Sequence, residues 1–175
     1  MIYTAHYDSP LGGMTMACDG IALVGLWFDG QKYFGAPDGA EENADIPVFR
    51  KTRKWLDVYF SGENPGFVPQ LSLNGSPFRR AVWDRLLGIP YGSTVTYGEI
   101  AEELGRRYGR RMSAQAVGGA VGHNPVSLIV PCHRVVGSDG SLTGYAGGVD
   151  KKRFLLTLEG VDMQKLYTPK KGTAL

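Results

Sequence analysis

Residues 96–121 read TYGEIAEELGRRYGRRMSAQAVGGAV, and this stretch predicts two helices joined by a short basic loop. Thr96 and Glu99 have the spacing of a capping box, so we expect the first helix to begin there and to continue through Leu104. Gly105 is the expected C-terminal stop, because glycine often follows the last helical turn. A helix, a short turn and a second helix are typical of a helix-turn-helix unit.

The second of these helices, expected over residues 114–121 after the N-cap Ser113, has an unusual composition. It contains three alanines, two glycines and no charged residue. Each glycine in a helix interior costs about 1 kcal/mol relative to alanine, so some gain must offset that cost. The small residues indicate either tight packing against another helix or close approach to a nucleic-acid groove.

The residues before this unit predict a smaller domain that combines strands with a helix. A hairpin signal at Asp19-Gly20 and a helical apolar pattern after Pro47 support this prediction. We therefore expect an α/β (α+β) chain with an N-terminal α/β domain and a mainly helical, winged helix-turn-helix-like C-terminal domain, divided into residues 1–70 and 71–175. The expected elements are strands over 2–8, 14–18 and 21–28, a loop over 29–45, and further helices over 47–60, 77–87 and 151–158.

Composition and charge exclude several classes of protein. The two cysteines among 175 residues are too few for a disulfide framework, so a reducing compartment is expected. The N-terminus lacks the features of a secretory signal, and no apolar run approaches the roughly 20 residues of a membrane span, so we expect a cytoplasmic protein without membrane contact. Residues 1–70 carry 5 Lys/Arg and 9 Asp/Glu, whereas residues 71–175 carry 14 and 8. The basic half is either a face for a polyanion or an ordinary solvated surface.

A cysteine, a histidine and an arginine follow one another in Pro131-Cys132-His133-Arg134-Val135. The apolar residues 126–130 before them predict a buried strand with Cys132 at its end. The thiolate is the nucleophilic form of cysteine, and neighbouring basic groups raise its fraction, so this setting suits a reactive thiol. A buried structural cysteine is the alternative.

Glu159 follows the last predicted helix, for which Asp150 is the expected N-cap. A carboxylate near His133 could orient the imidazole and fix its tautomer. Cysteine, histidine and a carboxylate are a recurring arrangement for an activated thiol. A surface carboxylate is the alternative for Glu159.

The second half of the chain also holds a set of short motifs in one order. These are Tyr97, Gln115-Ala116-Val117-Gly118-Gly119-Ala120, Asn124-Pro125, Pro131-Cys132-His133-Arg134-Val135 and Gly144-Tyr145-Ala146-Gly147-Gly148. Together, over about residues 76–162, they resemble the O6-alkylguanine-DNA alkyltransferases, also called methylated-DNA–protein-cysteine methyltransferases. The N-terminal part is similar to that family only in its general α/β pattern.

The resemblance implies a DNA repair protein that transfers an alkyl group from O6 of guanine, and from O4 of thymine, to its own Cys132 in a single turnover. His133 would take the thiol proton through a water molecule, and Glu159 would hold His133. Tyr97 would help to turn the nucleotide out of the stack and would donate a hydrogen bond to the base. Asn124 would brace the turn that carries the active-site loop. The expected partner is double-stranded DNA, and the expected protein is a monomer without a cofactor.

The resemblance also implies a base pocket and a DNA-binding face. The helix over residues 114–121 would lie in the minor groove, and Gln115 would fill the gap left by the flipped base, where many relatives have arginine. The expected pocket residues are Ser127, Val135, Tyr145 and Ala146. The expected DNA contacts are Ala114, Gln115, Ala116, Gly118, Arg106, Arg107, Arg110, Arg111 and Arg134.

Rival functions remain open at this point. A protein that senses alkylated DNA without repairing it would lack the nucleophile, which is present here as Cys132. A hydrolytic Cys–His enzyme would turn over, whereas an alkyltransferase reacts once. His6 and Cys18 are too few for a zinc site in the N-terminal domain, so we expect no metal. The absence of a second, four-cysteine repair domain argues against a transcriptional regulator.

Overall fold

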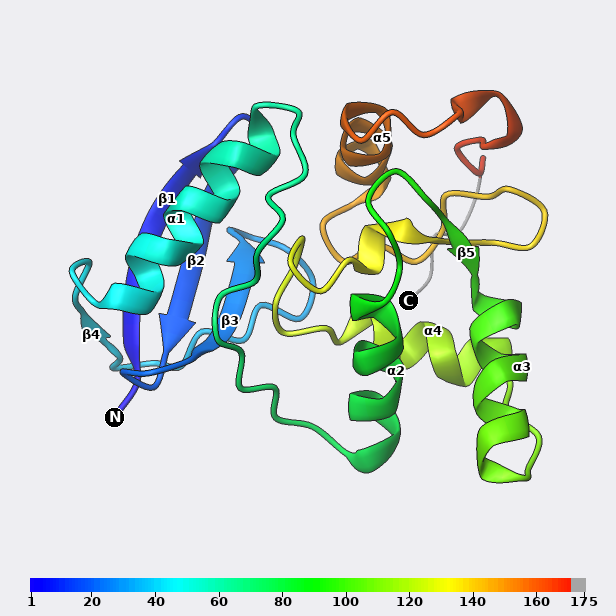
Figure 1. The fold of residues 1–175 in the computed structure, drawn as a ribbon, viewed down its shortest axis with the longest axis horizontal. Helices are drawn as coiled ribbons and strands as arrows, with labels where there is room; N and C mark the ends of the chain where they lie inside the picture. Colours follow the sequence, from blue (N-terminus) through cyan, green and yellow to red (C-terminus); the bar gives the residue numbers. More distant parts are fainter. Residues whose placement is uncertain (171–175) are drawn as a thin grey trace. The chain divides into compact units, whose positions relative to one another are not determined.

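A four-stranded sheet underlies the N-terminal part of the computed structural model, which describes residues 1–170. Strands β1 (Tyr3–Ser9), β2 (Gly12–Cys18) and β3 (Leu23–Phe28) form an antiparallel meander. The short strand β4 (Glu41–Glu42) runs parallel to β1, so the strand order is β3-β2-β1-β4. Helix α1 (Pro47–Phe60) lies across one face of this sheet (Figure 1).

The core of this unit forms between the sheet and α1. Strands β1 and β2 pair residue for residue over their full length, which fixes the side chains that face the helix. Met14 and Met16 of β2 are fully buried, as are Phe49, Leu56 and Tyr59 of α1. Burying a large apolar side chain contributes about 1.5–3 kcal/mol, so these contacts hold the helix on the sheet.

Most of the sequence predictions for this unit are confirmed, and α1 has the predicted bounds. Strand β3 begins at Leu23 rather than at Ile21, because the Asp19 carboxylate accepts hydrogen bonds from the backbone N–H groups of Ile21 and Ala22 and keeps them in the turn. Strand β4 was not predicted. Its two exposed glutamates lack the apolar alternation that marks a half-buried strand.

The predicted strand over residues 126–130 is wrong. A single bridge joins Val126 to Leu26, and Leu128 has a left-handed backbone with φ 70°, which ends the extended conformation. All five residues are buried. The apolar run therefore correctly indicated burial but not backbone conformation. A short apolar run cannot by itself distinguish a strand from a buried irregular segment.

The chain divides into two compact units, although not at a single point. Residues 1–74 together with 125–129 form the N-terminal unit, and residues 75–124 with the chain from 130 onward form the C-terminal unit. The sequence predicted one boundary after residue 70. Residues 125–129 belong to the first unit because they pair with β3. No sequence pattern predicted this pairing.

Four α-helices and a small parallel sheet make up the described part of the C-terminal unit (Figure 1). The mixed architecture of sheet and helices places the whole chain in the α/β class that the sequence predicted. The elements are α2 (Pro77–Leu87), α3 (Tyr97–Tyr108), α4 (Ala114–Gly122), α5 (Val149–Leu158), β5 (Val95–Thr96), β6 (Val135–Val136) and the 3₁₀ turns η1 (Cys132–Arg134) and η2 (Met163–Lys165).

Caps at the helix N-termini confirm the predicted starts of α2, α3 and α4. Ser76 accepts a hydrogen bond from the backbone N–H of Arg79, and Thr96 and Glu99 form both hydrogen bonds of the capping box. Ser113 caps α4 in the same way. Each such cap stabilises a helix by about 1 kcal/mol, which explains why sequence identifies these starts reliably.

The predicted end of α3 at Gly105 is wrong, because the helix continues to Tyr108. Gly109, with φ 65°, is the residue that ends it. Gly105 instead allows a close approach of the chain: a Cβ atom there would lie 2.9 Å from the Arg110 carbonyl oxygen. Arg106 therefore lies on the last turn of α3 rather than in the loop.

The start of α5 also differs from the prediction. Gly148, with φ 97°, occupies the N-cap position, and Asp150 lies inside the first turn without capping it. An acidic residue in the first turn still interacts favourably with the helix dipole. Within residues 1–170, no helix has both the length and the apolar character that crossing a bilayer requires.

Candidate active site

Cys132 begins the turn η1, between the buried segment before it and strand β6. Its backbone N–H donates to the Val130 carbonyl at 2.8 Å, and the N–H of Arg134 donates to the Pro131 carbonyl at 3.0 Å. The whole residue is only 5% exposed. A reagent therefore reaches the thiol only if it enters the protein.

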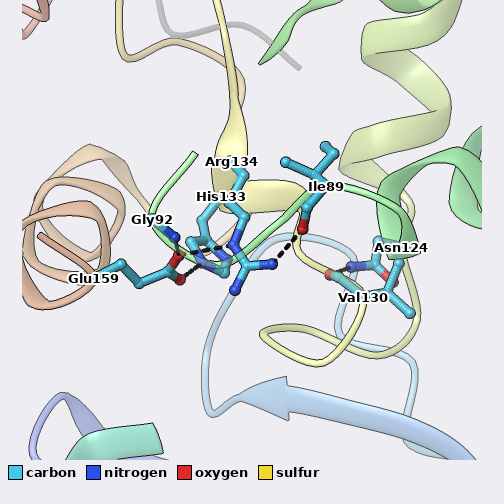
Figure 2. A network of polar contacts seen from close by, with 7 residues as sticks. All are labelled: Ile89, Gly92, Asn124, Val130, His133, Arg134 and Glu159. Atoms are coloured by element: carbon cyan, nitrogen blue, oxygen red, sulfur yellow. Dashed lines mark hydrogen bonds and ion pairs between the residues drawn. The ribbon is translucent and has the colours of Figure 1, made fainter. Parts of the chain in front are cut away.

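His133 contacts Glu159, which stands at the C-terminal end of α5. The distance from His133 Nε2 to Glu159 Oε2 is 2.5 Å, and both side chains are completely buried. The other carboxylate oxygen, Oε1, accepts from the backbone N–H of Gly92 at 3.0 Å and from Arg134 Nε at 2.8 Å. Figure 2 shows these groups converging on the carboxylate. The alternative of a surface carboxylate for Glu159 is therefore wrong.

The burial and contacts of this pair determine its charge. Burial by itself would raise the pKa of Glu159, but the hydrogen bonds and charges of His133 and Arg134 bring it down to about 2. Burial lowers the pKa of His133, and this effect exceeds the opposing one of Glu159. The resting pair is thus a neutral imidazole beside an ionised carboxylate. In that state the Nε2–H group donates a hydrogen bond to Glu159, and Nδ1 is the basic nitrogen.

Arg134 lies in the interior, although the sequence placed it among the DNA contacts. Its side chain is 9% exposed, and Nη1 donates to the Ile89 carbonyl at 2.7 Å (Figure 2). The guanidinium also lies 5.7 Å from the centroid of the Tyr91 ring. Because its polar groups serve Glu159 and Ile89, we assign Arg134 to the support of the carboxylate rather than to a DNA surface.

The surroundings of Cys132 do not favour the thiolate in the way that the sequence suggested. Burial raises the pKa of its thiol, and a hydrogen bond with Asn124 and the positive charge of Lys152 oppose that rise. Asn124 Nδ2 donates to the Val130 carbonyl at 2.7 Å, so this amide contacts the chain on both sides of the bend before Cys132. The resting group is a protonated thiol, and it needs a base to become a nucleophile.

Lys152 is a site residue that the sequence did not predict. It stands between Lys151 and Arg153 in what looks like a run of surface charges, yet it is completely buried. A signal was present: Leu155 and Leu156 lie three and four residues further along α5, which places position 152 on the buried face of the helix.

A cavity of about 320 Å³ opens beside Tyr97. The Tyr97 hydroxyl donates to the Thr143 carbonyl at 2.8 Å, which holds the ring at the edge of this cavity. Burial raises the pKa of Tyr97, so its hydroxyl stays protonated and can donate. The lining residues are Tyr97, Ala114, Gln115, Gly118, Gly119, Thr143 and Gly144.

Gly118 and Gly119 of α4 are not needed for packing inside the described protein. A Cβ atom at Gly118 would make only ordinary contacts with the Tyr97 ring at 3.9 Å, and one at Gly119 would meet nothing within 4 Å. Ala114, Gln115 and Ala116 are exposed at the start of the same helix. Tight helix–helix packing therefore does not explain Gly118 and Gly119, and close approach to another molecule remains.

The arginines on the last turn of α3 and in the loop before α4 are exposed. Arg106, Arg110 and Arg111 line a shallow cavity of about 450 Å³, and Arg107 lines a second one of about 270 Å³ with Arg80. Arg106 also pairs with Glu102 at 3.0 Å on the surface of α3. Such an exposed pair is worth well under about 1 kcal/mol, so it leaves the arginine available to another anion.

The four expected pocket residues have different positions. Val135 and Tyr145 are buried in the C-terminal unit, and Ala146 is partly buried. The Tyr145 hydroxyl is buried without a hydrogen-bond partner among residues 1–170. Ser127, in contrast, belongs to the N-terminal unit, where its hydroxyl donates to Gln31 at 3.5 Å.

Two sequence profiles of known families match the chain. The profile described as "6-O-methylguanine DNA methyltransferase, DNA binding domain" matches residues 77–161. The profile described as "6-O-methylguanine DNA methyltransferase, ribonuclease-like domain" matches residues 2–72. Together these ranges cover most of the chain.

Relatives and a solved structure are similar over nearly the same length. A methylated-DNA–protein-cysteine methyltransferase of Mycobacterium tuberculosis is 45% identical over 159 residues, which cover 91% of this chain and 93% of the relative. One of Methanosarcina acetivorans is 44% identical over 160 residues, which cover 91% and 99%. The crystal structure of Mycobacterium tuberculosis OGT in complex with DNA is 42% identical with a TM-score of 0.78, over 90% of this chain and 92% of that one.

Proposed function

Because the chain belongs to the methylated-DNA–protein-cysteine methyltransferases, enzymes of alkyl-transfer DNA repair, we propose that Cys132 accepts the alkyl group from O6-alkylguanine in double-stranded DNA. The contact of His133 with Glu159, next to this buried thiol, carries the proposal. We propose O4-alkylthymine as a second substrate, because it also bears the alkyl group on an exocyclic oxygen.

The reaction begins with the proton of the thiol. His133 Nδ1 takes this proton, through a water molecule, and the imidazolium that forms is stabilised by the ionised Glu159. A carboxylate whose pKa is about 2 keeps its negative charge at neutral pH, so it is ready for this role. Arg134 and the N–H of Gly92 hold the carboxylate in place.

The thiolate then attacks the alkyl carbon in a displacement reaction. A carbon–sulfur bond forms, the carbon–O6 bond breaks, and the electron pair of that bond remains on the guanine. Tyr97, whose hydroxyl donates to the Thr143 carbonyl in this structure, redirects this donor to the leaving base as negative charge develops on it. The proton that His133 took from the thiol is returned to the base, so that the products are guanine and an S-alkyl cysteine and His133 is neutral again. A thioether is not hydrolysed under these conditions, and each molecule therefore reacts once.

The base must leave the DNA stack to reach a thiol that is 5% exposed. Turning a base out costs a few kcal/mol, and less for a damaged base that pairs poorly. The cavity beside Tyr97 is the space that receives the base, with Gln115 of α4 at its rim. In this proposal Gln115 fills the gap left in the stack, by its length and hydrogen-bonding groups rather than by charge.

Helix α4 makes the close approach to DNA, in the minor groove. The empty space above Gly119 supports this orientation, because a side chain there would contact the DNA rather than the protein. The exposed arginines at residues 106, 107, 110 and 111 would bind phosphates beside it. The monomeric state and the cytoplasmic location expected from the sequence stay predictions.

A titration tests this function against its rivals. A duplex that contains O6-methylguanine is added in increasing excess over the protein, and the restored guanine is counted. We expect a plateau at one guanine per protein molecule. Continued turnover would favour a hydrolytic enzyme, and binding without any restored guanine would favour a lesion sensor.

A further inference from the structure

The segment after α5 lies against the loop that follows the acceptor cysteine. Residues 161–168, which we call the C-terminal strap, come after Glu159 and include the turn η2. The loop, residues 137–142, begins directly after β6 and ends one residue before Thr143, which lines the cavity proposed for the base. The mechanism above uses neither the strap nor the loop.

Backbone hydrogen bonds join the strap to the loop. The N–H of Leu142 donates to the Tyr167 carbonyl at 2.9 Å, and the N–H of Tyr167 donates to the Gly140 carbonyl at 3.0 Å. These bonds form a parallel bridge between Ser141 and Tyr167. The Tyr167 hydroxyl also donates to Asp139 at 2.5 Å on the surface. One residue of the strap thus holds successive residues of the loop.

Apolar side chains continue the contact below the backbone. Val136 of β6, Leu142 of the loop and Leu156 of α5 are buried in one small core. Three partly buried side chains of the strap pack against it, namely Val161, Met163 and Leu166. Because burial of apolar surface favours this arrangement, the attachment of the strap does not depend on hydrogen bonds alone.

The strap and the loop approach so closely that a glycine is needed between them. Gly140 has φ 88°, and a Cβ atom there would lie 2.1 Å from the Lys165 carbonyl oxygen. The far end of the strap is attached to α5, where Arg153 Nη2 donates to the Thr168 hydroxyl at 2.8 Å. The strap is therefore fixed on both sides of its contact with the loop.

The loop connects this contact to the cavity for the base. Thr143 and Gly144, which follow Leu142 directly, line that cavity. The Thr143 carbonyl also accepts from the Tyr97 hydroxyl at 2.8 Å. A displacement of Leu142 would therefore move the cavity wall, and a misplacement of about 1 Å at a reacting centre can slow a reaction by about a hundredfold.

We propose that the C-terminal strap positions the wall of the base cavity for alkyl transfer, by holding the loop through Tyr167 and Gly140. Within residues 1–170 the cavity is lined by other segments, so Tyr167 and Gly140 are positioning residues that act through Thr143. This inference rests on the proposed function, because it concerns the same cavity.

The test breaks the contact from each side. Tyr167→Pro removes the N–H that donates to Gly140, and Gly140→Ala places a methyl group against the Lys165 carbonyl. Tyr167→Phe is the match for the first change, since it keeps the backbone pairing and loses only the hydroxyl contact with Asp139. Gly39→Ala is the match for the second, because Gly39 has φ 75° and open space at its Cβ position.

Methyl transfer is measured at saturating O6-methylguanine duplex and from the free O6-methylguanine base, together with duplex affinity and the plateau of restored guanine. We expect Tyr167→Pro and Gly140→Ala to slow transfer from duplex and free base by a similar factor of at least about tenfold, because one cavity wall serves both substrates. Duplex affinity and the plateau should stay at their wild-type values, and the two matched controls should react at nearly the wild-type rate. The double variant should be little slower than the slower single variant, because both changes break one contact.

A wild-type rate in both strap variants would overturn the proposal. A lower plateau with an unchanged rate would also overturn it, because the strap would then support only the stability of the fold. A defect confined to the duplex would instead make the strap a DNA contact. If Tyr167→Pro does not fold, Leu166→Ala removes part of the apolar contact, and the same pattern is expected of it.

The controls also separate this inference from the proposed function. If the wild-type protein transfers no methyl group from the duplex, the proposed function fails. A defect confined to the strap variants concerns this inference alone.

Discussion

His133 and Glu159 are 26 residues apart in the chain, yet their side chains meet at 2.5 Å in a fully buried pair. The end of α5 brings the carboxylate to the turn that carries Cys132. A buried carboxylate without partners would be costly, and here three donors share its two oxygens. The pair therefore keeps the ionised carboxylate of Glu159 next to the neutral imidazole of His133.

The first prediction concerns this pair as a single relay. His133→Ala or Glu159→Gln should each slow alkyl transfer by at least about tenfold, because each removes the base or its stabilising charge. The double variant should lose less than the sum of the two free-energy changes, since coupled residues are not additive. Single-turnover rates measure this, with Glu102→Gln on the surface of α3 as the control. Strict additivity would show that the two residues act separately.

The second prediction concerns stability in acid. The pKa of Glu159 is lowered from 4.5 to about 2, so between these values the unfolded chain binds a proton that the folded protein does not. The contribution of Glu159 to the free energy of unfolding, at most about 3 kcal/mol, is thus present above pH 4.5 and lost as the pH falls toward 2. The lowered pKa of His133 acts in the same direction below about pH 6.5.

Urea unfolding at several pH values checks this prediction. The difference in free energy of unfolding between the wild-type protein and Glu159→Gln should be largest above pH 4.5 and should narrow toward pH 2. A difference that stays constant over this range would show that Glu159 keeps an ordinary pKa in the folded protein.

How far the sequence predicts the fold depends on local chemistry. The starts of α2, α3 and α4 were found because Ser76, Thr96 and Ser113 cap them through their own side chains. The end of α3 was missed because Gly105 serves a close approach of the chain, and composition does not separate that role from a helix stop. The strand expected over residues 126–130 was wrong because an apolar run indicates that residues are buried but not which backbone conformation they adopt.

The site shows the same limit. Cys132 and His133 are adjacent in the chain, so the sequence alone places them together. The partnership of His133 with the distant Glu159 was expected from the family resemblance, and the two side chains do meet in the structure. Lys152 was missed because its charge suggested solvent, whereas its position on α5 faces inward. Arg134 was expected among the DNA contacts from the family resemblance, whereas its ion pair with the buried Glu159 holds it inside.

The third prediction concerns the exposed arginines between α3 and α4. Replacing Arg110 and Arg111 with alanine should make the log–log dependence of duplex affinity on salt shallower by up to about 1.8, because each phosphate contact contributes about 0.9. Fluorescence anisotropy at several salt concentrations measures the slope. The same change at Lys51 and Lys54 of α1 serves as the control. An unchanged slope in the arginine variant would place the DNA-binding face elsewhere.

The fourth prediction concerns Gly119 of α4. Gly119→Ala and Gly119→Leu should fold with equal or higher stability, because a Cβ atom at this position meets nothing within 4 Å and both residues favour a helix by up to about 1 kcal/mol over glycine. Duplex affinity should fall in the order glycine, alanine, leucine, as the side chain enters the groove. Thermal unfolding and duplex binding separate the two effects. Unchanged affinity in Gly119→Leu would exclude close approach of α4 to DNA at this residue.

The identity of the acceptor is the central claim, and peptide-resolved mass spectrometry tests it most directly. The protein is incubated with a duplex that contains O6-methylguanine, digested, and searched for a methylated cysteine. We predict one methyl group on Cys132 and none on Cys18, which lies buried in β2 of the other unit. Cys132→Ala should bind the duplex and remain unmethylated. A methyl group on Cys18, or restored guanine with no modified cysteine, would contradict the account.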